Sequence, residues 1–225
     1  MLNSKINHFY EARQAMVDSQ VHPMGIVSEK LLETMNIVPR ELFVPENLQS
    51  VCYCDEDVEI AKGRYLMEPS VLARMVQALK PQEDHVALTI GSGIGYNAAI
   101  LSHLVSTVVS LEEERTLIEQ AQASWDKLSY MNIVAVIGPL NEGAPVNAPY
   151  DIIIINGAVV DIPQEIKEQL NIGGRLVAPV KSAGQAMAKV TLVERIDENS
   201  FSETILFDAG TPYLQGFEPR NEFVF

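Results

Sequence analysis

Residues Val86 to Ser102 read VALTIGSGIGYNAAILS, and this stretch decides the fold that the sequence predicts. It begins with a buried-strand pattern over residues 86–90, continues through a glycine-rich turn and ends in residues that favour a helix. Glycine has no Cβ, so the backbone of such a turn can approach a ligand closely. The N–H groups at the start of the following helix then face that ligand.

A second apolar segment, residues 105–111, predicts a neighbouring parallel strand, and Glu112 stands at its end. A carboxylate at that position can accept hydrogen bonds from the two hydroxyl groups of a ribose. The two strands and the helix between them therefore predict a β-α-β unit with a nucleotide-like cofactor site. We expect the cofactor to be held by Gly91, Ser92, Gly93, Gly95 and Glu112. The alternative is that the three glycines only make a sharp turn.

The spacing of the glycines indicates which cofactor is bound. They follow the pattern G-x-G-x-G, whereas dinucleotide-binding folds usually show G-x-G-x-x-G, and Tyr96 stands at the last glycine position of that pattern. A bulky residue there weakens the helix-to-strand packing and the pyrophosphate approach that are typical of NAD sites. An adenosyl cofactor without phosphates avoids this conflict. S-adenosylmethionine is therefore the predicted cofactor, and an NAD-dependent oxidoreductase is a distant alternative.

The composition narrows the classes of partner. The chain has 225 residues, with 16 Lys and Arg against 30 Asp and Glu, which gives a formal net charge of −14. This excess of acids would repel phosphate backbones, so we expect no nucleic-acid partner. The first 20 residues contain neither a secretory apolar region nor a membrane-spanning run, so we expect a cytoplasmic protein with no membrane partner. The sequence leaves the oligomeric state open.

The cysteines and histidines predict no metal site. Cys52 and Cys54 are spaced C-x-C, where a disulfide would be strained, and no second pair with zinc-ligand spacing accompanies them. The four histidines lie far apart and form no H-E-x-x-H pattern. We therefore expect the two cysteines to be reduced packing residues.

Helical and strand-like patterns alternate along most of the chain, which predicts an α/β fold with a parallel sheet. Residues 4–40 read as helical around a break at Pro23 and Gly25, and residues 39–69 as an ordered loop region with a short strand or two. We predict a helical cap with its loop over residues 1–80, packed on a main domain of residues 81–225. The later elements are helices over 71–79, 96–104, 115–128 and 164–170, strands over 86–90, 108–111, 133–137, 151–156 and 176–180, and an antiparallel pair over 188–195 and 201–207.

Residues 38–46 read VPRELFVPE, which matches the V-P-R-E-x-F-V-P-E signature of the protein-L-isoaspartate O-methyltransferase family. Shorter matches at 90–99, 110–112, 148–151 and 173–177 extend the resemblance over most of the chain. The resemblance implies a Rossmann-like fold of S-adenosylmethionine-dependent methyltransferases, with a seven-stranded mixed sheet. It also implies an enzyme that methylates a carboxylate of an isoaspartyl residue in a damaged peptide or protein, a protein-repair reaction.

The acceptor loop departs from the pattern of that family. The family commonly reads G-Q-T-I-S-Q-P where this chain has GRYLMEP over residues 63–69, so Met67 replaces the serine. The candidate acceptor-site residues are Arg64, whose guanidinium can bind a carboxylate through two hydrogen bonds, Ser70 with its hydroxyl, and Met67 itself. The alternatives are a solvated Arg64, a Ser70 that only starts a helix and a Met67 that only fills the core.

Residues expected near the cofactor also depart from the family pattern. Thr89 stands where the family has an acid, and residues 138–140 read GPL in place of G-D-G. Pro139 supplies neither a carboxylate nor an N–H, so only the backbone at Leu140 remains as a predicted adenine contact. These departures leave a second hypothesis open, in which the chain is a non-catalytic or re-specialised relative that binds S-adenosylmethionine without isoaspartyl activity.

Overall fold

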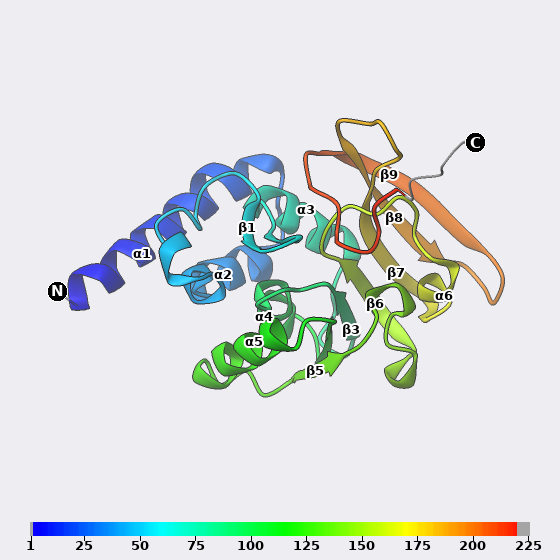
Figure 1. Ribbon diagram of the computed structural model, residues 1–225, viewed down its shortest axis with the longest axis horizontal. Coiled ribbons are helices and arrows are strands. Elements are labelled where there is room, and N and C mark those ends of the chain that lie inside the picture. Colours follow the sequence, from blue (N-terminus) through cyan, green and yellow to red (C-terminus); the bar gives the residue numbers. More distant parts are fainter. Residues whose placement is uncertain (1, 220–225) are drawn as a thin grey trace.

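The computed structural model describes residues 2–219, with side chains from His8 onward. The described residues contain nine strands and six α-helices. Figure 1 places the helical α1–α2 region and strands β8–β9 at opposite ends of the molecule. The helices are α1 Leu2–Met16, α2 Glu29–Ile37, α3 Pro69–Leu79, α4 Tyr96–Ser102, α5 Arg115–Lys127 and α6 Gln164–Lys167. The strands are β1 Val58–Ala61, β2 Arg64–Leu66, β3 Val86–Ile90, β4 Thr107–Glu112, β5 Ile133–Ile137, β6 Tyr150–Ile155, β7 Leu170–Val180, β8 Ala188–Arg195 and β9 Phe201–Ala209.

One seven-stranded sheet organises the described chain, in the order β5-β4-β3-β6-β7-β8-β9. Strands β3 to β7 run parallel, and β8 and β9 are added antiparallel at one edge. The strand order reverses between β3 and β6, because the chain first builds outward to β5 and then returns to the other side of β3. Ligands of open α/β sheets bind at the carboxyl ends of the strands beside such a reversal. The predicted seven-stranded mixed sheet is confirmed.

The two faces of the sheet are covered differently. Alternate residues of the strands face α3, α4 and α5 on one side, where the larger apolar cluster also includes residues of the N-terminal helices. The other face is covered by the short α6 and by residues 210–217, which follow β9 and contribute Leu214 and Phe217 to a second cluster. The run Ile152 to Ile155 is buried on both sides, as expected for a central parallel strand.

The N-terminal helices join the main core through a buried arginine. Arg40 lies in a 3-10 turn, is fully buried, and donates from Nε to the carbonyl of Cys52 and from Nη2 to that of Met67 at 2.6 Å. Its guanidinium also lies 4.9 Å from the ring centroid of Tyr96. One side chain thereby connects the segment after α2, the loop before α3 and the start of α4. The division at residue 80 stays a prediction, and this shared packing supports a cap closely joined to the main domain.

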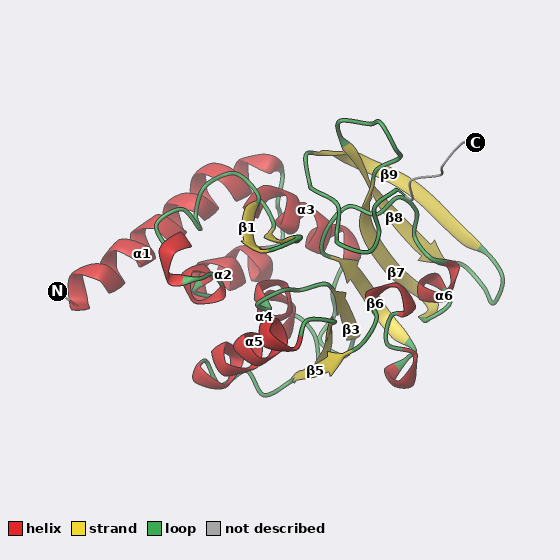
Figure 2. Cartoon of the chain, in the orientation of Figure 1, coloured by secondary structure: helices red, strands yellow, loops and turns green. Residues whose placement is uncertain are grey.

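A separate two-stranded hairpin, β1–β2, lies between the helical cap and the sheet (Figure 2). Its strands pair antiparallel, and the turn between them contains Gly63 with φ +66°. Val58, Ile60, Arg64 and Leu66 point into the molecule and are buried. The sequence had indicated a short strand or two in this region. Among residues 2–219, no helix has the length and apolar character needed to cross a bilayer.

Two predicted boundaries are wrong. The helix expected over residues 164–170 ends at Lys167, and the strand expected from Leu176 already begins at Leu170. Gly173 and Gly174, which fall between the predicted helix and the predicted strand, lie inside that strand, where the pairing with β6 shifts register between Tyr150 and Ile152. Glycines within a strand often mark such an irregularity, and a local pattern does not separate it from a turn.

The buried position of Arg40 gives a test of the fold. We expect Arg40→Lys to lower the free energy of unfolding by about 1.5–3 kcal/mol, because an ammonium keeps the charge but not the fork that reaches two carbonyls. Chemical denaturation measures this change. Arg115→Lys, at a side chain that is 73% exposed, is the control and should change stability by less than about 0.5 kcal/mol. Equal effects of the two substitutions would contradict the described role of Arg40.

Candidate functional site

The glycine-rich turn follows β3 directly and has the backbone conformation that glycine makes possible. Gly91, Gly93 and Gly95 have φ values of +69°, +54° and +86°. The amide of Gly91 donates to the carbonyl of Leu111 in β4 at 2.9 Å, which fixes the turn at the carboxyl ends of both strands. Three left-handed residues within five positions would be strained with any other side chain. The residue types of the turn therefore follow from its geometry.

Polar side chains tie this turn to the neighbouring strands. The hydroxyls of Ser92 and Ser110 lie 2.6 Å apart, and both side chains are buried. After β6, the side-chain amide of Asn156 donates to the carbonyl of Ile90 at 2.9 Å and accepts from Asn97 in α4. The loops after β3, β4 and β6 are thus held in one arrangement.

The structure brings Glu112 against the turn, as the sequence predicted. Its carboxylate is fully buried and accepts a hydrogen bond from the amide of Gly93 at 3.0 Å. It also accepts from the amides of Glu113 at 2.9 Å and Glu114 at 3.2 Å. An acid in this position has the chemistry to bind a ribose. That Gly91, Ser92, Gly93, Gly95 and Glu112 bind a cofactor stays a prediction.

Arg64 of the β1–β2 hairpin is bound to the same acid. Its Nη2 lies 2.9 Å from Glu112 Oε1, and its Nε lies 3.1 Å from both carboxylate oxygens. Nη2 also lies 2.9 Å from Glu113, whose side chain is 38% exposed. Burial lowers the pKa of Arg64, but the bonds and charges of the two glutamates outweigh it, so the pKa is raised and the group stays charged. The alternative of a solvated Arg64 is wrong, since only 1% of its side chain is exposed.

Protein side chains also cover the turn. A Cβ added to Gly93 would lie 2.8 Å from Ile60 of the hairpin, and one added to Gly91 would lie 2.7 Å from Leu214. Leu214 belongs to the segment after β9, whose Tyr213 pairs with Ala158 beyond β6. Sequence analysis missed both Ile60 and Leu214, because no motif marks an apolar residue that reaches the turn from a distant segment.

The remaining candidates take structural positions. Ser70 is buried in the first turn of α3, and its hydroxyl donates to the carboxylate of Glu68. Met67 is 2% exposed within the larger apolar cluster, and Leu140 is 2% exposed in the second one. These positions agree with the alternatives of a helix start and a core residue for Ser70 and Met67. An acceptor or adenine role for these residues stays a prediction.

Cys52 does not add a reactive group to the site. Cys52 and Cys54 are both free, and burial raises the pKa of the Cys52 thiol to about 12. The thiol is therefore protonated at neutral pH and does not act as a nucleophile. Among the described residues, no three His, Cys, Asp or Glu side chains are grouped so that they could hold a metal ion.

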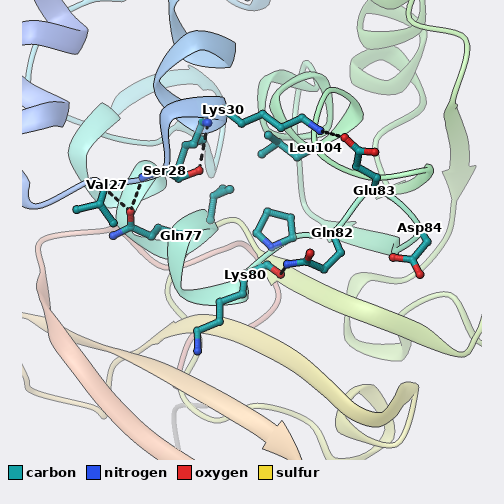
Figure 3. A pocket seen from close by; sticks show the side chains of 12 residues that line it. Val27, Ser28, Lys30, Gln77, Lys80, Gln82, Glu83, Asp84 and Leu104 are labelled. Atoms are coloured by element: carbon teal, nitrogen blue, oxygen red, sulfur yellow. Dashed lines mark hydrogen bonds and ion pairs between the residues drawn. The ribbon is translucent and has the colours of Figure 1, made fainter.

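A cavity of about 850 Å³ lies at the other end of β3, between α2, α3 and the loop that leads into the strand (Figure 3). Lys30 and Glu83 form an ion pair at 2.8 Å across it, and Gln77 accepts from the amides of Val27 and Ser28. None of the predicted site residues lines it. Its lining carries charges of both signs, including Lys80 and Asp84, and indicates no particular ligand.

Comparison with known proteins decides the family. The family model described as protein-L-isoaspartate(D-aspartate) O-methyltransferase matches residues 11–208. The chain belongs to this family. A protein-L-isoaspartate O-methyltransferase of Herpetosiphon aurantiacus is 40% identical over 173 residues, 77% of each chain. One from Methanoculleus marisnigri is 39% identical over 168 residues, 75% of this chain and 76% of its relative.

Solved structures confirm the methyltransferase fold of this protein-L-isoaspartate O-methyltransferase family member. A structure named protein-L-isoaspartate O-methyltransferase superimposes with a TM-score of 0.78 at 24% identity, covering 92% of this chain and 66% of that chain. A Plasmodium falciparum protein, described as a putative member in complex with S-adenosyl-L-homocysteine, gives a TM-score of 0.74 at 17% identity. It covers 90% of this chain and 98% of that chain.

In this protein, Gly95, the third glycine of the turn, packs closely against Trp125. A Cβ on Gly95 would lie 2.3 Å from the Trp125 ring, whose Nε1 donates to the carbonyl of Gly95 at 3.0 Å. We expect Gly95→Ala to lower the free energy of unfolding by about 2–5 kcal/mol, the sum of a left-handed backbone and an overpacked contact.

Gly25→Ala is the matched control for this test. Gly25 has a similar φ of +83°, and nothing lies within 4 Å of its added Cβ. That substitution should cost only the backbone part, about 1–2 kcal/mol. Denaturation curves that show the same loss for both variants would contradict the packing described for Gly95 and Trp125.

Proposed function

We propose that this protein transfers the methyl group of S-adenosylmethionine to the free α-carboxylate of an isoaspartyl residue in a peptide or protein. The observation that carries the proposal is family membership over residues 11–208. The site supports it, because a left-handed glycine turn after β3 lies against a carboxylate at the end of β4. Relatives with 38–40% identity share the name protein-L-isoaspartate O-methyltransferase.

The residues present fit an adenosyl cofactor by type and position. Glu112 stands where two hydroxyl groups of a ribose can be bound, and the glycines of the turn carry no Cβ that would keep a ligand away from the backbone. Bound S-adenosylmethionine would supply an electrophilic methyl group on a sulfonium. In the described conformation the turn is covered by Ile60 and Leu214, so binding requires these side chains to move.

The methyl-transfer reaction requires no proton transfer to or from the protein. A carboxylate acceptor is ionised near neutral pH, so no general base is needed. As the C–O bond forms, the C–S bond breaks, and the carboxylate and the sulfonium lose their opposite charges together. The residues of the site then have to orient the two groups and exclude water, which in favourable intramolecular reactions contributes about 7–11 kcal/mol. The hairpin and the segment around Leu214 are the elements placed to exclude water.

A second candidate function is a re-specialised relative that binds the cofactor without isoaspartyl activity. Two observations favour it. The hydroxyl of Ser70, which follows the acceptor loop, is bound to Glu68, and the loop carries Met67 where the family has a serine. A missing hydrogen bond to a charged acceptor would lower activity by about ten- to a hundredfold.

The partner and the location follow from the same proposal. The acceptor is a peptide or protein, and the net charge of −14 argues against nucleic acid. We also propose a cytoplasmic location, which the two free thiols of Cys52 and Cys54 support, because thiols stay reduced in that compartment.

Release of methanol from an isoaspartyl peptide tests the activity. With S-adenosylmethionine labelled in the methyl group, we expect base-labile methyl ester on the isoaspartyl peptide at least tenfold above the matched aspartyl peptide. The two peptides differ only in which carboxylate is free. Equal labelling of both, or none with either, at a cofactor concentration shown to saturate the protein would reject the isoaspartyl activity and favour the second candidate.

A further inference from the structure

We propose that Arg64 is a latch on the cofactor site: in the cofactor-free protein its guanidinium occupies the carboxylate of Glu112, and ribose binding must displace it. This inference rests on the proposed function, because it concerns how the cofactor reaches its site. It assigns to Arg64 a competing role in place of the acceptor-binding role considered from sequence.

The carboxylate of Glu112 has no free acceptor position in the described structure. It accepts three hydrogen bonds from backbone amides, of Gly93, Glu113 and Glu114. Three further contacts come from the guanidinium of Arg64. A carboxylate offers about four lone-pair sites, so the donors already present saturate it. Two ribose hydroxyls can bind there only if the guanidinium leaves.

The hairpin that carries Arg64 is held in the fold by its side chains, because its strands do not pair with the seven-stranded sheet. It forms its own two-stranded sheet of four and three residues, outside the seven-stranded sheet. Isolated hairpins of this size are marginally stable, so little main-chain structure opposes their displacement. Ile60 lies on the same hairpin and covers Gly93, so one movement removes both the side chain over the turn and the guanidinium on the acid.

An opening already exists beside the latch. A cavity of about 330 Å³ is lined by Ala61 and Lys62 of the hairpin turn, by Gln215, and by Glu114, Thr116 and Leu117 at the start of α5. It lies next to the segment 112–114 that surrounds the carboxylate. The hairpin turn therefore borders a space into which it can move, or through which a ligand can enter.

Both charged groups keep partners when the latch opens. Glu112 retains its three backbone donors and gains the hydroxyls of the ribose. Arg64 retains Glu113, which is 38% exposed and 2.9 Å from Nη2, so the guanidinium can follow that carboxylate toward water. Neither charge is left buried without a partner, so opening avoids the large free-energy cost of an unpaired buried charge. The two arrangements thus form a two-state element that the cofactor biases.

Binding of S-adenosylhomocysteine, measured by calorimetry, tests the latch. This probe has no sulfonium charge, so changes in protein charge affect its binding little. If the closed state dominates, the apparent dissociation constant is raised by the inverse of the open fraction. We expect Arg64→Gln to bind the probe at least tenfold more tightly than the wild type. Glu113→Gln removes a contact that the open and closed states share, so its affinity should stay within about twofold of the wild type.

Lys127→Gln is the matched control, since Lys127 is an exposed cation in the last turn of α5 that takes no part in the pair. Its affinity should stay within about twofold of the wild type. Hydrogen exchange on the wild type provides a second measurement that does not depend on whether Arg64→Gln folds. We expect residues 58–66 to change their exchange rates when the probe is bound, as the hairpin moves.

The outcomes separate the latch from the proposed function. The latch would be overturned if the wild type and Arg64→Gln bound the probe with equal affinity, or if hydrogen exchange over residues 58–66 stayed unchanged at saturation. Methyl transfer would then still be tested by the methanol assay. Binding by neither protein would also overturn the latch, because removing Arg64 should open the site. Tighter binding by Arg64→Gln together with an inactive methanol assay would support the latch and reject the isoaspartyl activity.

Discussion

The buried ion pair between Arg64 and Glu112 is the interaction on which the arrangement of the site depends. Two opposite charges, 1% and 0% exposed, lie 2.9 Å apart at the carboxyl end of β4. Removing one member of such a pair typically costs about 3–5 kcal/mol, because the other charge is left buried. The pair therefore holds the hairpin on the sheet. The same carboxylate is the group that a ribose would need, so folding and cofactor binding compete for one side chain.

Two apolar side chains lie against the glycine turn. Ile60 comes with the hairpin, and Leu214 comes with the segment after β9, so two distant parts of the chain close over one turn. The family model ends at residue 208, before Leu214. The apolar contacts keep water from the turn when no ligand is bound. Under the proposed latch, the affinity for a cofactor includes the free energy of opening the site.

Much of the fold could be predicted from sequence. The apolar run before Gly91, together with Glu112, predicted the β-α-β unit. The continuous isoleucines of β6 predicted the central strand, because a strand buried on both faces has an uninterrupted apolar sequence. The start of β7 was missed, since Gly173 and Gly174 look the same in a turn and in an irregular strand. The signature over residues 38–46 identified the family.

The candidate site was harder to predict. The proximity of Glu112 to Gly93 follows from strand order, so the sequence could indicate it. The partner of Arg64 lies 48 residues away on a different sheet, and no local pattern encodes that distance. An arginine in a loop is usually solvated, and only the fold shows that this one is buried.

The state of the Arg64 Nε–H group in solution tests the central claim most directly. Nitrogen-15 spectra of the wild type, with the signal assigned by its loss in Arg64→Lys, report whether that proton is protected from solvent. The account predicts a slowly exchanging Nε–H signal in the free protein that shifts or broadens as S-adenosylhomocysteine is added. A rapidly exchanging signal in the free protein, or one that stays unchanged at saturation, would contradict it.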